Sequence, residues 1–219
     1  MFKLEKFEKF ILDNGCLIIN KKPIKLKSGR ISYYDVDIRN SMENSESLKE
    51  LCKYIYAYTE ENNLKPDAYL GVPETGTPIA LILNTLINYK KSSTVPQIML
   101  RSHPKKYQAI ETHYSVTPIP KNLKFVLIED DVTTGNSLRE CIKRLLKLNV
   151  KIQAVISITN RLEKRSDGKT VEKLIIGNFK IPFYSITNSQ RLIQEYTKHH
   201  TINPDISKKI NNYFKKYCN

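Results

Sequence analysis

The feature that most constrains this chain is a short apolar segment that ends in consecutive acidic residues and passes directly into a hydroxyl-rich turn. Residues 125 to 128 are all apolar, residues 129 to 131 are all acidic, and residues 132 to 137 read Val-Thr-Thr-Gly-Asn-Ser. A continuous apolar run of this length is typical of a strand buried on both faces of a parallel sheet. An apolar stripe at helical spacing follows in residues 138 to 146. The pattern predicts a strand, a loop and a helix.

The same order of elements recurs along the chain and indicates the fold class. Residues 68 to 72 form a second candidate strand, followed by a loop at residues 73 to 77 and an apolar helix at residues 78 to 87. Residues 154 to 158 supply a further strand. Strands that alternate with helices build a parallel sheet whose ligands lie at the carboxyl ends of the strands. We therefore predict an α/β fold with a central parallel sheet flanked by helices.

The terminal segments add smaller elements to this sheet. Residues 1 to 12 mix lysine and glutamate with apolar residues as an amphipathic helix does, and residues 15 to 39 alternate around Gly29 as a hairpin or an extended hood does. A chain of 219 residues has room for one well-buried domain. We predict a single domain over residues 1–219, made of an N-terminal helix and hood in 1–45, an α/β core in 46–195 and a C-terminal helix in 196–219.

Composition bears on the compartment and the partners. The longest apolar run, residues 78 to 83, is far shorter than the ~20 residues that a membrane crossing needs. The four cysteines have neither paired spacing nor clustered histidines, which indicates neither a zinc site nor a disulfide framework and favours the cytoplasm. The net charge of +14 raises nucleic-acid binding as an alternative. The lysines are spread along the chain, however, and a polyphosphate substrate also favours positive potential.

The acidic strand end and the turn after it suit a ribose 5-phosphate. Backbone N–H groups and the hydroxyls of Thr133, Thr134 and Ser137 can surround a phosphate at a helix N-terminus, where the helix dipole favours an anion. Carboxylates do not bind that phosphate, but they accept hydrogen bonds from hydroxyls and stabilise developing positive charge. The segment therefore predicts a sugar-phosphate site.

This segment resembles the type I phosphoribosyltransferases, whose motif has an apolar strand, two acidic residues and a Thr-Thr-Gly-x-Ser-like phosphate loop. Counted back from the Thr-Thr-Gly turn, the acidic pair falls on Glu129 and Asp130, and Asp131 stands where the family usually has an aliphatic residue. If Asp130 and Asp131 were taken as the acidic pair, the loop would be shifted by one residue against the family motif. We therefore favour the alignment in which the pair is Glu129 and Asp130. A plain acidic strand end before a threonine N-cap is the alternative without this function.

The resemblance implies the type I fold, a reaction and a set of site residues. A base would displace diphosphate from 5-phosphoribosyl 1-diphosphate, and Glu129 and Asp130 would stabilise the cation-like ribose as catalytic residues. Mg²⁺ would be held mainly through oxygens of the substrate, with no dedicated protein ligands. The residues implied to bind the 5-phosphate are Thr133, Thr134, Gly135, Asn136 and Ser137.

Other segments resemble the orotate phosphoribosyltransferases in particular. Residues 26 to 30 read Leu-Lys-Ser-Gly-Arg, similar to the Leu-Lys-Ser-Gly of these enzymes, and Asp-Ile-Arg follows at the spacing of their Asp-Leu-Arg. The resemblance implies that Lys27 approaches the substrates. It also places Arg161 where these enzymes have a base-contacting arginine, and a guanidinium suits the carboxylate of orotate. Tyr33 and Asp35 replace a proline and an aromatic residue of the family, which leaves the base-facing wall open.

The segment from Gly71 to Pro78 looks like the diphosphate-contacting loop of the family. Thr75 replaces a lysine often found there, but the backbone amides around Thr75 and Gly76 can still hold anionic oxygens. A turn of this composition before a helix also occurs for purely structural reasons, so the assignment depends on the neighbouring motifs.

Residues 101 to 120 have no sustained periodicity and resemble the mobile catalytic loop of the family. Arg101 and Lys105 match its first arginine and last lysine, and Lys106 is adjacent, so these cations are expected at the leaving diphosphate. Ser102 and Tyr107 replace its other lysine and its histidine, which leaves general acid help open.

We therefore predict an orotate phosphoribosyltransferase of pyrimidine nucleotide biosynthesis, which forms orotidine 5'-phosphate and diphosphate. The resemblance implies a homodimer in which Arg101 and Lys105 reach the neighbouring site. One alternative is a purine or another pyrimidine as the base. Another is a phosphoribosyltransferase-like regulator that binds nucleic acid, against which the retained acidic pair argues.

Overall fold

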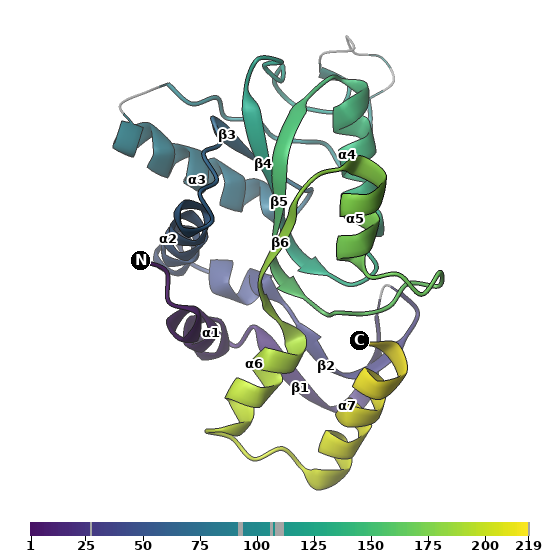
Figure 1. The fold of residues 1–219 in the computed structure, drawn as a ribbon. Helices are drawn as coiled ribbons and strands as arrows, with labels where there is room; N and C mark the ends of the chain where they lie inside the picture. Colours follow the sequence, from purple (N-terminus) through teal and green to yellow (C-terminus); the bar gives the residue numbers. More distant parts are fainter. Residues whose placement is uncertain (27, 92–93, 106, 108–111, 219) are drawn as a thin grey trace.

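A parallel sheet lies at the centre of the molecule (Figure 1). The computed structural model describes residues 1–26, 28–91, 94–105, 107 and 112–218, so Lys27 and Lys106 lie outside the described residues. Within these ranges the strands of the sheet lie side by side in chain order: β3 (Ala68–Gly71), β4 (Lys124–Val132), β5 (Lys151–Asn160) and β6 (Phe183–Asn188). The predicted α/β fold with a central parallel sheet is confirmed.

Helices cover both faces of the sheet: α2 (Ser45–Glu61) and α3 (Gly76–Lys91) one face, α4 (Asn136–Lys147) and α5 (Val171–Phe179) the other (Figure 1). Successive side chains of a strand point to opposite faces. Val126 and Ile128 of β4 accordingly join the apolar cluster that contains residues of α2 and α3. Phe125 and Leu127 join the cluster that contains residues of α4 and α5. The apolar run in β4 is continuous because both of its faces are buried.

The N-terminal segment forms the predicted helix and hood, made of α1 (Leu4–Asp13), the strands β1 (Leu17–Lys25) and β2 (Ile31–Val36), and the short 3-10 helix η1 (Ile38–Met42). β1 and β2 pair antiparallel, with a shift in register between Ile19 and Ile24. Phe7 and Tyr34 from this segment belong to the same buried cluster as Ile128 of the sheet. This shared core supports our proposal that the whole chain is one domain.

The C-terminal segment contains α6 (Ser189–Thr197) and α7 (Pro204–Tyr217), and α7 packs against the hood (Figure 1). The Asn203 side chain caps α7 by accepting hydrogen bonds from the backbone N–H groups of Asp205 and Ile206. The ring of Tyr34 in β2 lies 5.6 Å from that of Tyr213 and 5.3 Å from that of Phe214. The described helices are all too short or too polar to cross a bilayer.

The end of β3 and the first turn of α3 approach each other so closely that Gly71 has no room for a side chain. A Cβ atom built on Gly71 would lie 2.1 Å from the carbonyl carbon of Gly76. Both glycines contribute backbone atoms to this contact, and backbone atoms cannot rotate aside as a side chain does. The pair therefore sets the path of the loop between β3 and α3.

We expect Gly71→Ala to lower the free energy of unfolding by about 1–3 kcal/mol or more, because the added methyl group forces backbone shifts in a packed region. The matched control is Gly177→Ala in α5, where a Cβ atom would meet nothing within 4 Å. There alanine is expected to stabilise the helix by roughly 0.5–1 kcal/mol. Urea denaturation followed by circular dichroism measures both, and an unchanged Gly71→Ala would contradict the close approach.

Candidate functional site

The phosphate loop connects β4 to α4 at the carboxyl edge of the sheet, as the sequence predicted. Gly135, the N-cap of α4, has a φ of 67°, in the left-handed region that favours glycine. A Cβ atom on Gly135 would also lie 2.7 Å from Cγ1 of Val171. Thr133 and Thr134 precede this turn, and Asn136 and Ser137 begin the helix. The turn thus places hydroxyl groups and free N–H groups at the positive end of a helix.

Arg165 is a cation at this loop that the sequence pattern did not predict. Its Nη1 donates hydrogen bonds to the carbonyl oxygen of Thr134 and, at 3.2 Å, to Oδ1 of Asn136. The side chain is only 12% exposed. Arg165 lies in a segment without periodicity after β5, so chain folding alone brings it to the loop. Its guanidinium adds positive charge where an anion would bind.

The diphosphate loop lies beside the phosphate loop, because β3 and β4 are adjacent. The Val72 N–H donates to the Ile128 carbonyl at 2.8 Å, and the Gly76 N–H donates to the Val72 carbonyl at 3.1 Å. Thr75 ends the loop, and Gly76 is the first residue of α3. The structure therefore brings both predicted anion-binding loops to one edge of the sheet.

The first two acids at the end of β4 face different surroundings. Glu129 is buried, and burial together with this carboxylate raises the pKa of the Cys141 thiol in α4 to about 12. Asp130 lies on the side of the hood, where it adds to the effect of Asp37 in raising the pKa of the Arg39 guanidinium. The register of the sequence motif paired Glu129 with Asp130, but the structure directs these two carboxylates toward different elements.

Asp131 is the acid that faces the centre of the hood side. Its carboxylate accepts a hydrogen bond of 2.7 Å from Oγ1 of Thr159 in β5. Burial raises the pKa of Asp131 to about 7, although Arg161 and Thr159 act in the opposite direction. Asp130 and Asp35 add to the effect of burial, because ionising a carboxylate beside other negative charges is costly. The sequence pattern gave Asp131 no role in the site.

Arg161 follows β5 as predicted, but its side chain is buried, with 1% exposed. Nε donates to Oε1 of Glu163 at 2.8 Å, whereas Nη1 lies 3.4 Å from Oδ1 of Asp35 and Nη2 lies 3.4 Å from Oγ of Ser32. Cζ lies 4.3 Å from the centre of the Tyr34 ring. The contacts at 3.4 Å are long for hydrogen bonds. The Nη atoms of Arg161 are therefore held less tightly than its Nε atom.

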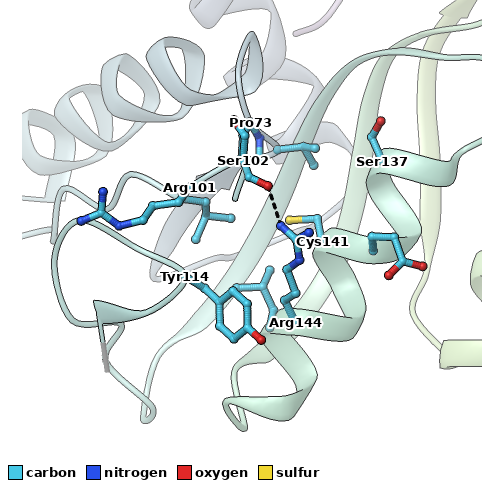
Figure 2. Close-up of a pocket in the computed structure, with 11 residues that line it drawn as sticks. Pro73, Arg101, Ser102, Tyr114, Ser137, Cys141 and Arg144 are labelled. Carbon is cyan, nitrogen blue, oxygen red and sulfur yellow. Dashed lines mark hydrogen bonds between the residues drawn. The ribbon is translucent and has the colours of Figure 1, made fainter. Parts of the chain in front are cut away.

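The start of the predicted lid contacts α4 and the diphosphate loop. The Ser102 carbonyl accepts a hydrogen bond of 2.8 Å from Nη1 of Arg144 in α4, and the Ser102 hydroxyl lies 3.2 Å from Oε1 of Glu74. Arg101 extends away from Ser137 and α4 in Figure 2, and its Nε donates to the Ser115 carbonyl at 3.1 Å. Lys105 is exposed. The structure thus does not bring the Arg101 side chain to the phosphate loop of the same chain.

The fold and the arrangement of the loops are those expected of a phosphoribosyltransferase, and the comparisons with known proteins agree with this class. Residues 40–192 match the family model of the phosphoribosyl transferase domain, so the chain belongs to this family. Its relatives narrow the class. The orotate phosphoribosyltransferase of Pyrococcus horikoshii is 31% identical over 156 residues, which cover 67% of this chain and 77% of that protein.

Further comparisons extend the likeness. The orotate phosphoribosyltransferase of Caenorhabditis elegans is 29% identical over 139 residues, which are 62% of this chain but only 56% of that longer relative. The crystal structure of orotate phosphoribosyltransferase from Francisella tularensis superposes with a TM-score of 0.74 at 25% identity and covers 98% of this chain and 100% of that chain. The transcriptional regulator GfcR of Methanocaldococcus jannaschii is 27% identical over 135 residues, 59% of this chain and 63% of that protein.

The raised pKa of Asp131 makes the stability depend on pH. Because its folded value of about 7 exceeds the ordinary 3.8, the folded state keeps a proton that the unfolded state has lost between these values, and stability falls as the pH rises through this window. Asp131→Asn keeps the shape without the charge. We expect it to unfold at higher urea concentration than the wild type at about pH 8, with the difference shrinking toward about pH 5.

The control for this experiment is Asp167→Asn. A hydrogen bond from the backbone of Lys169 lowers the pKa of Asp167, so this exposed group is ionised in both states throughout the window. Its substitution should shift the urea midpoint equally at both pH values. A wild type and an Asp131→Asn variant with parallel pH profiles would contradict the assigned environment of Asp131.

Proposed function

We propose that this chain is an orotate phosphoribosyltransferase that converts orotate and 5-phosphoribosyl 1-diphosphate into orotidine 5'-phosphate and diphosphate in pyrimidine nucleotide biosynthesis. The observation that carries the proposal is the meeting of an acidic strand end, two anion-binding loops and the Arg161 guanidinium at one edge of the sheet. The orotate phosphoribosyltransferases among its relatives support the choice of base. The buried, unpaired cysteines support a reducing compartment such as the cytoplasm.

The phosphate loop is proposed to bind the 5-phosphate of the ribose. Thr133, Thr134 and Ser137 offer hydroxyl donors, and the N-terminus of α4 offers N–H groups. Gly135 and Asn136 shape this turn. Arg165 adds a charge that the family motif does not contain. The loop around Thr75 and Gly76 is proposed to receive the diphosphate on the neighbouring strand.

The acidic strand end is proposed to stabilise the reacting ribose. As the C1–O bond to diphosphate breaks, the electron pair leaves with the diphosphate and C1 becomes cation-like until a ring nitrogen of orotate bonds to it. Asp130, on the hood side, is placed to accept hydrogen bonds from the ribose hydroxyls and to favour that positive charge. Glu129, against α4, is proposed as the second acid. Because Glu129 is buried, water has little access to the positive charge that develops on C1.

Mg²⁺ is the ion expected with the diphosphate. The donors at this edge of the sheet are carboxylate and hydroxyl oxygens, which suit a hard divalent cation. Among the described residues no group of three or more metal-ligating side chains occurs. Asp130 and Glu129 are the nearest candidates to complement the oxygens of the substrate, and the bound ion would neutralise charge on the leaving group.

The lid is proposed to act across a homodimer. The Arg101 side chain extends away from the phosphate loop of its own chain and donates to the Ser115 carbonyl, whereas the Lys105 side chain is exposed; both are proposed to reach the neighbouring site when the lid closes. Cations in a closing lid neutralise a leaving diphosphate and exclude water. Lys27 and Lys106, which lie outside the described residues, remain expected substrate contacts.

The principal test measures diphosphate release with orotate, 5-phosphoribosyl 1-diphosphate and Mg²⁺. Asp130→Asn should reduce turnover by roughly 10-fold or more, because one lost charge interaction in the transition state is commonly worth over ~1.4 kcal/mol. Asp13→Asn, an exposed aspartate of α1, is the matched control and should keep wild-type turnover. Near-normal turnover of folded Asp130→Asn would contradict the catalytic role assigned to Asp130. If the wild type released no diphosphate, the proposed reaction itself would be wrong.

A second prediction concerns Asp35, which stands beside the proposed carboxylate-binding arginine. Its carboxylate lies 3.4 Å from Nη1 of Arg161 and competes with the carboxylate of orotate for the same edge. Asp35→Asn removes the competing charge, so the KM for orotate should fall by roughly 3- to 10-fold, the equivalent of about 1 kcal/mol of charge repulsion. The KM for 5-phosphoribosyl 1-diphosphate is the internal control and should stay constant. A higher KM for orotate would mean that Asp35 itself supports substrate binding.

The likeness to GfcR and the net charge of +14 favour nucleic-acid binding as a second candidate function. Salt-dependent binding of DNA or RNA by a chain that releases no diphosphate with any base would establish it. Release with a purine or another pyrimidine, and none with orotate, would instead change the base.

A further inference from the structure

A buried carboxylate joins the base side of the site to the C-terminal helix. Glu163 has a fully buried side chain. Its Oε1 accepts hydrogen bonds from Nε of Arg161 at 2.8 Å and from the Tyr213 hydroxyl at 2.5 Å, and its Oε2 accepts one from Nη1 of Arg30 at 2.6 Å. Glu163 therefore links the end of β5, the hood and α7.

Aromatic rings and the backbone hold Arg161 further. Its Cζ lies 4.3 Å from the centre of the Tyr34 ring and 5.9 Å from that of Tyr213. These two rings meet edge to face. The Arg161 carbonyl oxygen lies 3.3 Å from Sγ of Cys218, just after α7. The guanidinium plane is thus bounded by the hood on one side and by α7 on another.

The network holds one edge of the guanidinium more tightly than the other. Glu163 binds Nε at normal hydrogen-bond length, whereas both Nη contacts are 3.4 Å long. The partner of Nη1 is Asp35, whose side chain is 38% exposed and can move toward solvent. A planar guanidinium fixed through Nε presents its Nη atoms in a defined direction.

We propose that Glu163 and Tyr213 are positioning residues for base recognition, which hold Arg161 through Nε so that its Nη edge meets the carboxylate of the base. This inference rests on the proposed function. It gives α7 a role in specificity, although α7 lies far from the phosphate loops in the sequence. Buried ion pairs add little net stability compared with apolar residues of the same size, so a stabilising role alone accounts poorly for this network.

The test compares two nucleotides that differ only in the carboxylate, orotidine 5'-phosphate and uridine 5'-phosphate. Calorimetry gives the Kd of each for the wild type, Tyr213→Phe and Glu163→Gln. Both variants should raise the Kd for orotidine 5'-phosphate by roughly fivefold or more, because one hydrogen bond that supports a charged contact is lost. The Kd for uridine 5'-phosphate should stay unchanged. Tyr213→Phe keeps the ring and is the milder change if Glu163→Gln does not fold.

Tyr217→Phe is the matched control in the same helix. Within the part of the chain that is described, no hydrogen bond of the Tyr217 hydroxyl is seen, and its ring, which packs on Arg30, is retained. This variant should bind both nucleotides as the wild type does. A purely structural network would instead weaken both nucleotides equally in Tyr213→Phe and Glu163→Gln.

The outcomes separate the two proposals. A wild type that prefers orotidine 5'-phosphate, with variants that keep the full preference or lose affinity for both nucleotides alike, overturns the positioning role and leaves the function intact. A wild type without any preference for the carboxylate overturns orotate as the base, and the positioning role fails with it.

Discussion

The arrangement on the base side depends on one buried positive charge. Arg161 is almost completely removed from water, and a guanidinium in that position is tolerated only when carboxylates compensate it. Glu163 from the chain after β5 and Asp35 from the hood supply this compensation. Because Tyr213 of α7 also binds Glu163, the charge draws three separate parts of the chain together. Burial, with a smaller contribution from the nearby Asp130 and Asp35, raises the pKa of Asp131, so that it holds its proton to about neutral pH.

The phosphate side is built on a different principle. Its loops use backbone N–H groups, hydroxyls and helix N-termini, which bind anions without placing a buried charge in the sheet. Glycines permit close packing there: the backbone of Gly71 lies against that of Gly76, and the Val171 side chain packs against Gly135. Arg165 brings a cation to the phosphate loop from a different segment. In the proposed site, recognition of the base through charge is therefore separate from recognition of phosphate through the backbone.

The start of the lid contacts this rigid frame through Ser102, and the ring of Tyr114, further along the lid, lies 5.8 Å from Cζ of Arg144 in α4. Arg144 of α4 and Glu74 of the diphosphate loop both contact Ser102, so the start of the lid is held between that helix and that loop. The Arg101 side chain is directed away from Ser137 (Figure 2). This direction suits the closure over a neighbouring subunit that is proposed above.

The sequence by itself determined the α/β fold, the hood, the loop between β4 and α4 and the place of Arg161 after β5, because these depend on local periodicity and on turn chemistry that neighbouring residues carry. It did not reveal the direction of the acids at the end of β4, since the bend of a strand end decides which element each carboxylate meets. It also missed Arg165 and the network around Glu163. Arg30 and Tyr213 lie 183 positions apart along the chain, and folding brings both of them to the Glu163 carboxylate. Such contacts arise from packing between distant segments, which only the tertiary structure decides.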